Sequence, residues 1–158
     1  MIKKSFSKKM VPYLLLGTIL ILVDQVTKWV ALSTLASRIY SVSSWLTFRL
    51  VFNRGVSWGM FNSGETLPFL LVTAGIIIVT TIIAVSAYVG LCNKKPILGQ
   101  TLVVAGSLAN LIDRFVHHAV IDFIQLSYKG WSWPVFNIAD CCIVGGVILM
   151  IIQQTRNK

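Results

Sequence analysis

Two aspartates in this sequence have no basic neighbour to neutralise them. Asp122 lies in the segment V-I-D-F-I, and Asp140 lies in F-N-I-A-D near the start of an apolar run. Unpaired carboxylates in apolar surroundings are costly, so they usually serve a function. If the two side chains meet, mutual repulsion raises the pKa of one of them, and the pair can share a proton. Aspartic proteases use such a pair, in which one carboxylate activates water and the other polarises the scissile carbonyl.

Two apolar segments carry further polar residues at helical spacing. Asp24 and Lys28 lie four residues apart and can pair on one helix face. That pair either closes the end of a helix or contacts a substrate directly. Asn110 shares a helix face with Asp113 and with Arg114, which follow it by three and four residues. Because Asp113 directly precedes Arg114, these two residues predict a self-neutralising structural pair.

Two other patterns give weaker signals. His117 and His118 stand in tandem, but the sequence has only 2 His and its 3 Cys show no C-x-x-C spacing, so we expect no metal site. Gly55 and Gly59 have the G-x-x-x-G spacing of packed membrane helices. They lie between apolar runs rather than inside one, which favours tight backbone turns instead.

Four apolar runs must position these residues. The chain of 158 residues is 56% hydrophobic and 12% charged, whereas a soluble domain has about 25% charged residues. A membrane helix needs about 20 mostly apolar residues. We therefore predict a membrane α-helical fold, with a single domain over residues 1–158 and an uncleaved first span. The four predicted transmembrane helices cover residues 11–32, 67–91, 97–114 and 134–152, with Pro134 in the first turn of the last.

Charge predicts the orientation of these spans. Four spans leave both termini on one side, and none of the 5 acidic residues falls on that side. Cytoplasmic flanks collect Lys and Arg, so both termini should be cytoplasmic and every acidic residue, Glu65 included, should lie at or near the outer face. The net charge of +9 is then a topology signal, and we expect no nucleic-acid partner. The terminal side holds 8 of the 14 basic residues, namely Lys3, Lys4, Lys8, Lys9, Lys94, Lys95, Arg156 and Lys158.

The two outer loops contain β-strand patterns. Side chains in residues 46–53 alternate with period two, and V-I-D-F-I-Q-L (120–126) is rich in strand-forming residues. We expect these segments to pair into a small β-sheet on the outer, periplasmic or extracellular, face. Four tryptophans suit a position at the membrane interface, namely Trp45, Trp58, Trp131 and Trp133.

Taken together, five segments make the chain resemble the lipoprotein signal peptidases (signal peptidase II), which are bacterial integral-membrane aspartic proteases. The segments occur in the family's order, and at two positions Ala105 and Ala109 stand where the family usually has glycines. An added methyl there concerns helix packing and alters no catalytic position. The segments are D-Q-V-T-K (24–28), N-R-G-V-S-W-G (53–59), A-G-S-L-A-N-L-I-D-R (105–114), V-I-D-F (120–123) and F-N-I-A-D (136–140).

The resemblance implies that Asp122 and Asp140 are the catalytic dyad. It implies removal of signal peptides from prolipoproteins, cut before a diacylglyceryl-modified cysteine near the outer surface of the bacterial cytoplasmic (inner) membrane. The expected partners are this lipidated substrate and membrane lipid, with no metal or organic cofactor, and the expected state is a monomer. The further residues that we expect to bind substrate or support the site are Asp24, Lys28, Asn53, Gly55, Asn110, Asp113, Arg114 and Asn137.

Two other functions fit parts of the pattern. A small proton-coupled transporter or channel subunit would also place acids in its spans, although the repeated halves of many transporters do not appear in this sequence. A structural membrane adaptor would tolerate replacement of its acids, which fits poorly with acids grouped on one side. Cleavage of a lipidated prolipoprotein separates the three.

Overall fold

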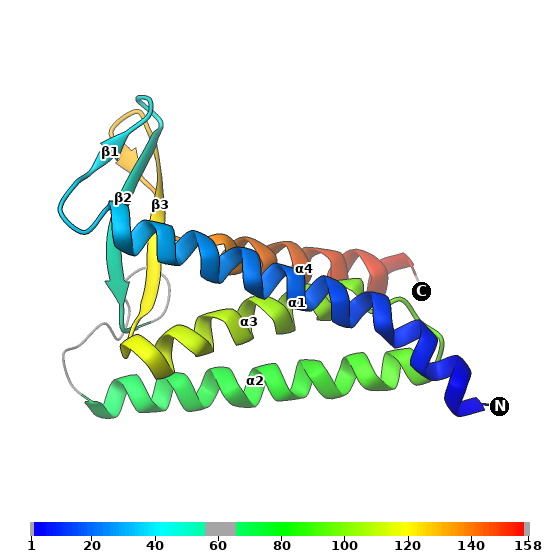
Figure 1. The fold of residues 1–158 in the computed structure, drawn as a ribbon. Helices are drawn as coiled ribbons and strands as arrows, with labels where there is room; N and C mark the ends of the chain where they lie inside the picture. Colours follow the sequence, from blue (N-terminus) through cyan, green and yellow to red (C-terminus); the bar gives the residue numbers. More distant parts are fainter. Residues whose placement is uncertain (1, 56–65, 157–158) are drawn as a thin grey trace.

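The structure, a computed structural model, describes residues 2–55 and 66–156, and the side chains of residues 9–55 and 66–155. Helices and a small antiparallel sheet make up this part of the chain (Figure 1). Some sequence predictions concern residues outside it. These are Trp58 at the membrane interface, Gly59 in a turn and Glu65 at the outer face.

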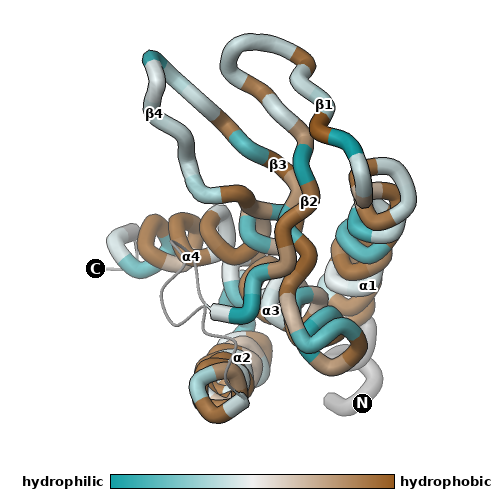
Figure 2. Tube along the Cα trace, turned by 90° about the vertical axis from the view of Figure 1, so that its left-hand side faces the viewer, coloured by the Kyte–Doolittle hydropathy of each residue, from teal (hydrophilic) through white to brown (hydrophobic). Residues whose placement is uncertain are grey.

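The helices run alternately in opposite directions, and the start of α1 and the end of α4 lie at the end of the bundle opposite the sheet (Figure 1). α3 lies between the other three helices and packs on each of them, as Figure 2 shows from the sheet end. The helices are α1 (Ile2–Thr34), α2 (Thr66–Cys92), α3 (Leu98–His117) and α4 (Ile138–Arg156).

Three helices in the described part of the chain are long and apolar enough to cross a membrane, so the chain is a membrane protein. They cover Lys9–Thr34, Thr66–Cys92 and Ile138–Thr155. α3 has 20 residues, a length of roughly 30 Å, but it carries polar residues that turn toward its neighbours. Three of the four predicted transmembrane helices are therefore confirmed as long and apolar enough to cross a membrane, and the central, more polar α3 is not among them.

The predicted start of the last helix is wrong. Pro134 does not occupy a first helical turn, because α4 begins at Ile138. The preceding segment is extended, and Phe136 forms an isolated β-bridge with Ile124. Phe136 exchanges backbone hydrogen bonds with Ile124 at 2.9 Å in both directions. This strand-like pairing delays the helix by a full turn and fixes the position of Asn137.

The predicted small sheet is confirmed. It has four antiparallel strands in chain order, and Val51 on the second strand lies opposite Asp122 on the third. A register shift between Phe48 and Val51 interrupts this pairing. The two outer strands have two residues each, too few to show an alternating pattern. The strands are β1 (Tyr40–Ser41), β2 (Leu46–Asn53), β3 (Val120–Tyr128) and β4 (Trp131–Ser132).

α3 and α4 approach each other closely because glycines line their contact. A Cβ on Gly99 would lie 2.8 Å from the carbonyl oxygen of Gly146, and a Cβ on Gly146 would lie 2.7 Å from that of Gly99. Small residues allow such backbone approach between membrane helices. Ala105 and Ala109 are 3% and 0% exposed, so the helix accommodates a methyl group at both positions.

We expect Gly106→Ala to destabilise the folded chain. A Cβ at Gly106 would lie 2.5 Å from the carbonyl oxygen of Ala139, so the backbone of α4 must move. Overpacking of this kind costs about 1–3 kcal/mol, measured as a lower thermal unfolding midpoint in detergent. The matched control is Gly145→Ala, where a Cβ would meet nothing within 4 Å. Equal midpoints for the two variants would contradict the close packing.

Candidate active site

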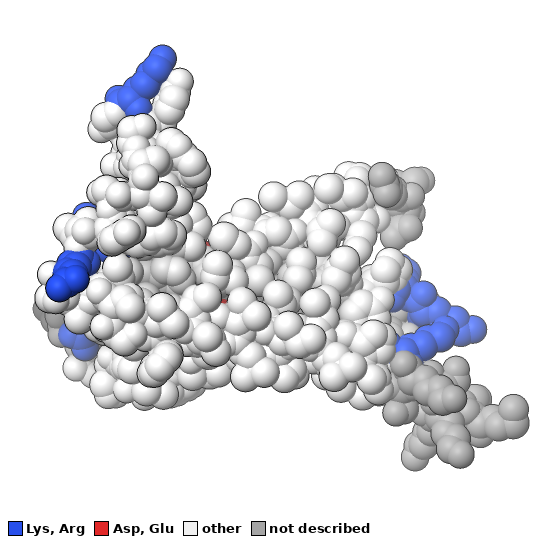
Figure 3. Space-filling view, turned by 45° about the horizontal axis from the view of Figure 1, so that its top comes forward, with Lys and Arg blue, Asp and Glu red and all other residues white. Residues whose placement is uncertain are grey.

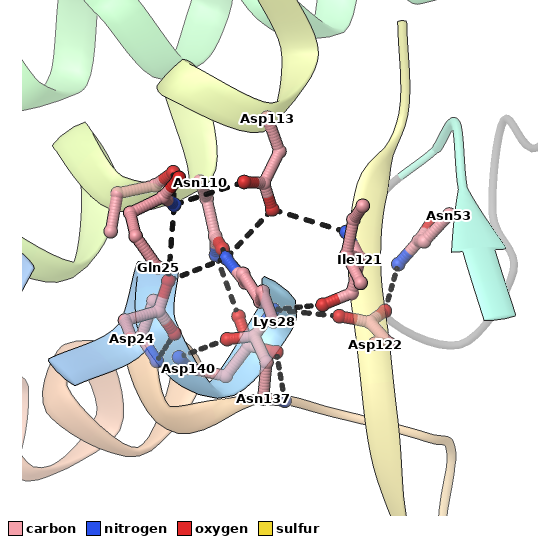
Figure 4. Close-up of polar contacts among 12 residues, drawn as sticks. Asp24, Gln25, Lys28, Asn53, Asn110, Asp113, Ile121, Asp122, Asn137 and Asp140 are labelled. Atoms are coloured by element: carbon pink, nitrogen blue, oxygen red, sulfur yellow. Dashed lines mark hydrogen bonds and ion pairs between the residues drawn. The ribbon is translucent and has the colours of Figure 1, made fainter. Parts of the chain in front are cut away.

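The four aspartates of the described residues converge at the sheet end of the helix bundle (Figure 4). Asp24, Asp113 and Asp122 are 1–2% exposed, and Asp140 is partly exposed. They come from α1, α3, β3 and α4, respectively. In Figure 3 basic side chains lie at both ends of the molecule, whereas the acids show only as traces in its middle. Residues spread over more than a hundred positions of sequence thus form one buried polar cluster.

Lys28 is the centre of this cluster. Its ammonium group lies 2.7 Å from Asp24 Oδ2 and 2.7 Å from Asp113 Oδ2, and it donates a 2.7 Å hydrogen bond to Asn110 Oδ1. An ammonium has three donors, and all three are used here. The predicted pairing of Asp24 with Lys28 is confirmed. Gln25 adds a 3.0 Å hydrogen bond to Asp113 Oδ1.

The predicted pairing of Asp113 with Arg114 is wrong. Asp113 pairs with Lys28, and its Oδ2 also accepts a 3.1 Å hydrogen bond from the backbone N–H of Ile121. Arg114 points to the other side of α3, since consecutive helical residues are rotated by about 100°. Its guanidinium donates to the backbone carbonyls of Arg54 (3.3 Å) and Gly55. Arg114 therefore holds the turn that follows β2.

Strand pairing brings Asn53 to Asp122. Asp122 lies opposite Val51, and Asn53 is two residues further along β2 on the same face of the sheet. The Asn53 amide donates a 3.0 Å hydrogen bond to Asp122 Oδ2, while its own Oδ1 accepts one from the N–H of Gly55 at 3.1 Å. The turn predicted at Gly55 thus orients Asn53. Arg114 holds this turn through its hydrogen bonds to the carbonyls of Arg54 and Gly55.

The start of α4 is held by a reciprocal cap that includes Asp140. Asn137 Oδ1 accepts the N–H of Asp140 at 2.9 Å, and Asp140 Oδ2 accepts the N–H of Asn137 at 3.2 Å. This is the capping-box arrangement, with Asn and Asp in place of the usual residue types. The N–H of Ala139, which has no partner within the helix, donates to Asp24 Oδ1 at 2.7 Å. A carboxylate from α1 therefore completes the N-terminus of α4.

Two asparagine side chains connect Asp122 with Asp140. The Asn137 amide donates a 2.7 Å hydrogen bond to Asp122 Oδ1, and the Asn110 amide donates a 2.9 Å one to Asp140 Oδ1. Asn137 also donates to Asn110 Oδ1 at 3.2 Å. Through Asn110 this chain of contacts reaches Lys28. Every residue that the sequence predicts for the site therefore lies in this cluster or holds part of it in place.

The surroundings of Asp122 favour its neutral form. The pKa of Asp122 is raised to about 7, chiefly because burial disfavours the charge and secondarily because of the nearby negative charge of Asp140. Hydrogen bonds from Asn53 and Asn137 and the charge of Lys28 lower the pKa but do not cancel these effects. Near neutral pH, Asp122 can therefore keep or release a proton.

Sequence reasoning missed two contributors to the site. Gln25 bridges α1 to α3 through its hydrogen bond to Asp113, and Thr73 on α2 accepts a 3.5 Å hydrogen bond from Arg114. Gln25 lies inside the segment D-Q-V-T-K, so that segment could have drawn attention to it. Thr73 has no such signal in an otherwise apolar run. Among the described residues no three His, Cys, Asp or Glu side chains are arranged to hold a metal ion.

The sequence is similar to known membrane peptidases over almost its full length. A sequence profile described as signal peptidase (SPase) II matches residues 16–156. A lipoprotein signal peptidase of Polynucleobacter necessarius subsp. necessarius (strain STIR1) is 33% identical over 153 residues, which cover 96% of this chain and 94% of that protein. A lipoprotein signal peptidase of Rickettsia conorii (strain ATCC VR-613 / Malish 7) is 36% identical over 145 residues, which cover 88% and 70% of the two chains.

The fold is similar to two solved structures of a bacterial membrane enzyme. One superposes with a TM-score of 0.75 and 28% sequence identity, covering 94% of this chain and 90% of that chain. The other has a TM-score of 0.74 and 27% identity, with 94% and 96% coverage.

Proposed function

The chain belongs to the signal peptidase II family, which removes signal peptides from prolipoproteins, and we propose that it performs this cleavage as an aspartic endopeptidase with Asp122 and Asp140 as its catalytic pair. The observation that carries the proposal is the convergence of these two carboxylates on one asparagine, Asn137. Each of the other two aspartates forms an ion pair with Lys28 instead. Family membership does not favour the transporter or channel alternative.

The two carboxylates take different roles in this proposal. Asp122, with its raised pKa, holds a proton and hydrogen-bonds the scissile carbonyl oxygen. Asp140, which is the more exposed of the two, takes a proton from the attacking water. Asn53, Asn110 and Asn137 orient the two carboxylates through their amide groups. Five further residues support the site indirectly, because they hold the backbone and the asparagine side chains around the two carboxylates. They are Asp24, Lys28, Gly55, Asp113 and Arg114.

A lipid-bearing substrate suits the surroundings of the site. A largely apolar cavity of about 500 Å³ lies between α1 and the sheet, and Phe123, next to Asp122, contributes to its lining. Exposed aromatic side chains on and beside the strands of the sheet, including Trp45, Trp131 and Trp133, suit a membrane interface. Both features support cleavage before a diacylglyceryl-modified cysteine near the membrane surface.

We further propose that all four helices cross the bacterial cytoplasmic (inner) membrane, with both termini cytoplasmic and the site near the outer leaflet. The alternating helix directions support this topology, as does the position of the start of α1 and the end of α4 at the same end of the bundle (Figure 1). The basic residues at the terminal end support the orientation. We also propose that the enzyme acts as a monomer.

The test is the pH dependence of cleavage by the purified chain in detergent, with a diacylglyceryl-modified model prolipoprotein as substrate. Asp122 must be protonated in this mechanism, and its pKa is about 7. Cleavage should therefore fall as the pH rises through about 7, because Asp122 then loses its proton. The measurement is kcat/KM between about pH 5 and pH 9.

The control for a thiol mechanism is the double variant Cys141→Ala, Cys142→Ala. Cys141 is exposed and Cys142 is partly exposed, and both follow Asp140 directly. We expect this variant to keep the activity and the pH profile of the wild type. Cleavage that rises steadily to pH 9 and disappears in the double variant would replace the aspartic mechanism with a cysteine one.

A further inference from the structure

A second cavity lies at the opposite end of the bundle from the acidic cluster. This inner groove, about 320 Å³ in volume, is formed by α1, α2 and α3. On α1 its lining runs from Met10 to Ile21, which at 1.5 Å per residue is roughly 16 Å. The hydrocarbon core of a bilayer is about 30 Å thick. The inner groove is therefore about one leaflet deep.

The walls of the inner groove suit a hydrocarbon chain. On α2 the lining residues are Ala84, Ala87, Tyr88 and Leu91, which share one helix face. Small residues such as Gly17 and Ala84 leave room in the groove. Its volume lies within the range of ligand pockets in proteins.

Three lysines lie at the terminal end of the inner groove. Lys9 precedes the lining residue Met10, and the turn with Lys94 and Lys95 joins the lining residues Leu91 and Ile97. All three lysines are exposed, and Figure 3 shows basic side chains gathered at this end. The acids of the described residues all lie at the other end, so nothing in that part of the chain neutralises these lysines.

We propose that the inner groove binds an anionic phospholipid. One acyl chain lies between α1, α2 and α3, and the phosphate lies beside Lys9, Lys94 and Lys95. Basic pockets between membrane helices on the cytoplasmic side bind anionic headgroups in this way. This site is separate from the proposed catalytic pair, so either proposal can fail without the other.

The test uses native mass spectrometry of the full chain in detergent, titrated with phosphatidylglycerol or with phosphatidylcholine of the same acyl chains. The wild type should bind phosphatidylglycerol at least about tenfold more tightly. Lys94→Gln combined with Lys95→Gln should weaken phosphatidylglycerol binding on the order of tenfold or more and leave phosphatidylcholine binding unchanged. The matched control neutralises two exposed cations at the sheet end, Arg49→Gln and Lys129→Gln, and should keep the preference.

A second pair of variants tests the acyl-chain part. Ala84→Phe fills the inner groove and should weaken binding of both lipids, whereas Val85→Phe, on an exposed neighbour outside the lining, should not. If Ala84→Phe does not fold, Ala87→Leu serves in its place. The proposal is overturned if the wild type binds the two lipids equally, or if either variant matches its control. It is also overturned if filling the groove abolishes prolipoprotein binding but not lipid binding, because the groove then belongs to the substrate.

Discussion

Asp122→Asn and Asp140→Asn should each abolish most cleavage of a lipidated prolipoprotein while leaving the chain folded. Asparagine keeps the size of the side chain and an oxygen that can accept from Asn137, but it cannot share or transfer a proton. General acid–base catalysis contributes about 10²–10⁴-fold to a rate, so each kcat should fall by that order. Because the two residues act as a unit, the double variant should be little worse than either single one.

Three measurements accompany these variants. Thermal unfolding in detergent should give midpoints close to that of the wild type, and KM should change much less than kcat. If the two single losses multiply in the double variant, the residues do not form a catalytic pair. A folded single variant with near wild-type turnover would remove that residue from the mechanism altogether.

Lys28→Met should unfold much of the protein. Without the ammonium group, Asp24 and Asp113 remain as two buried carboxylates that have lost their cation. Breaking a buried ion pair by removing one partner costs about 3–5 kcal/mol, which is a large part of the stability of a small protein. The expected result is a strongly lowered unfolding midpoint and a low yield of folded chain.

A rescue experiment separates charge from packing in this network. The triple variant Lys28→Met, Asp24→Asn, Asp113→Asn has no buried charge at these positions and should recover part of the lost stability. The control Lys129→Met removes an exposed lysine and should leave the midpoint unchanged. If Lys28→Met is as stable as the wild type, Lys28 does not hold the site together.

Local patterns in the sequence identified pairs within one helix but not pairs between helices. The pair of Asp24 and Lys28 follows from a spacing of four residues. The second partner of Lys28 is Asp113, 85 positions away, and no spacing rule predicts it. The sequence predicts an ion pair between Arg114 and its neighbour Asp113, whereas in the fold Arg114 donates to the backbone that follows β2. Tertiary packing decides such partners, and a single sequence does not record it.

For the strands too, the sequence predicts long local patterns but not single contacts between distant residues. β2 and β3 have eight and nine residues, which is long enough for an alternating pattern, and their pairing was predicted. The bridge between Ile124 and Phe136 involves one residue on each side. It nevertheless moves the start of α4 from the expected Pro134 to Ile138 and places Asn137 beside Asp122.

The hydrogen bond from Ala139 to Asp24 has a consequence for the biogenesis of the enzyme. It joins the first helix to the last, so the polar cluster is complete only when the chain from Asp24 to Asp140 has been made. A nascent polypeptide that ends before Asn137 contains Asp122 without one of the two amides that donate to it and without Asp140. In the proposed mechanism such a chain has no catalytic pair, so cleavage can begin only once α4 is in place.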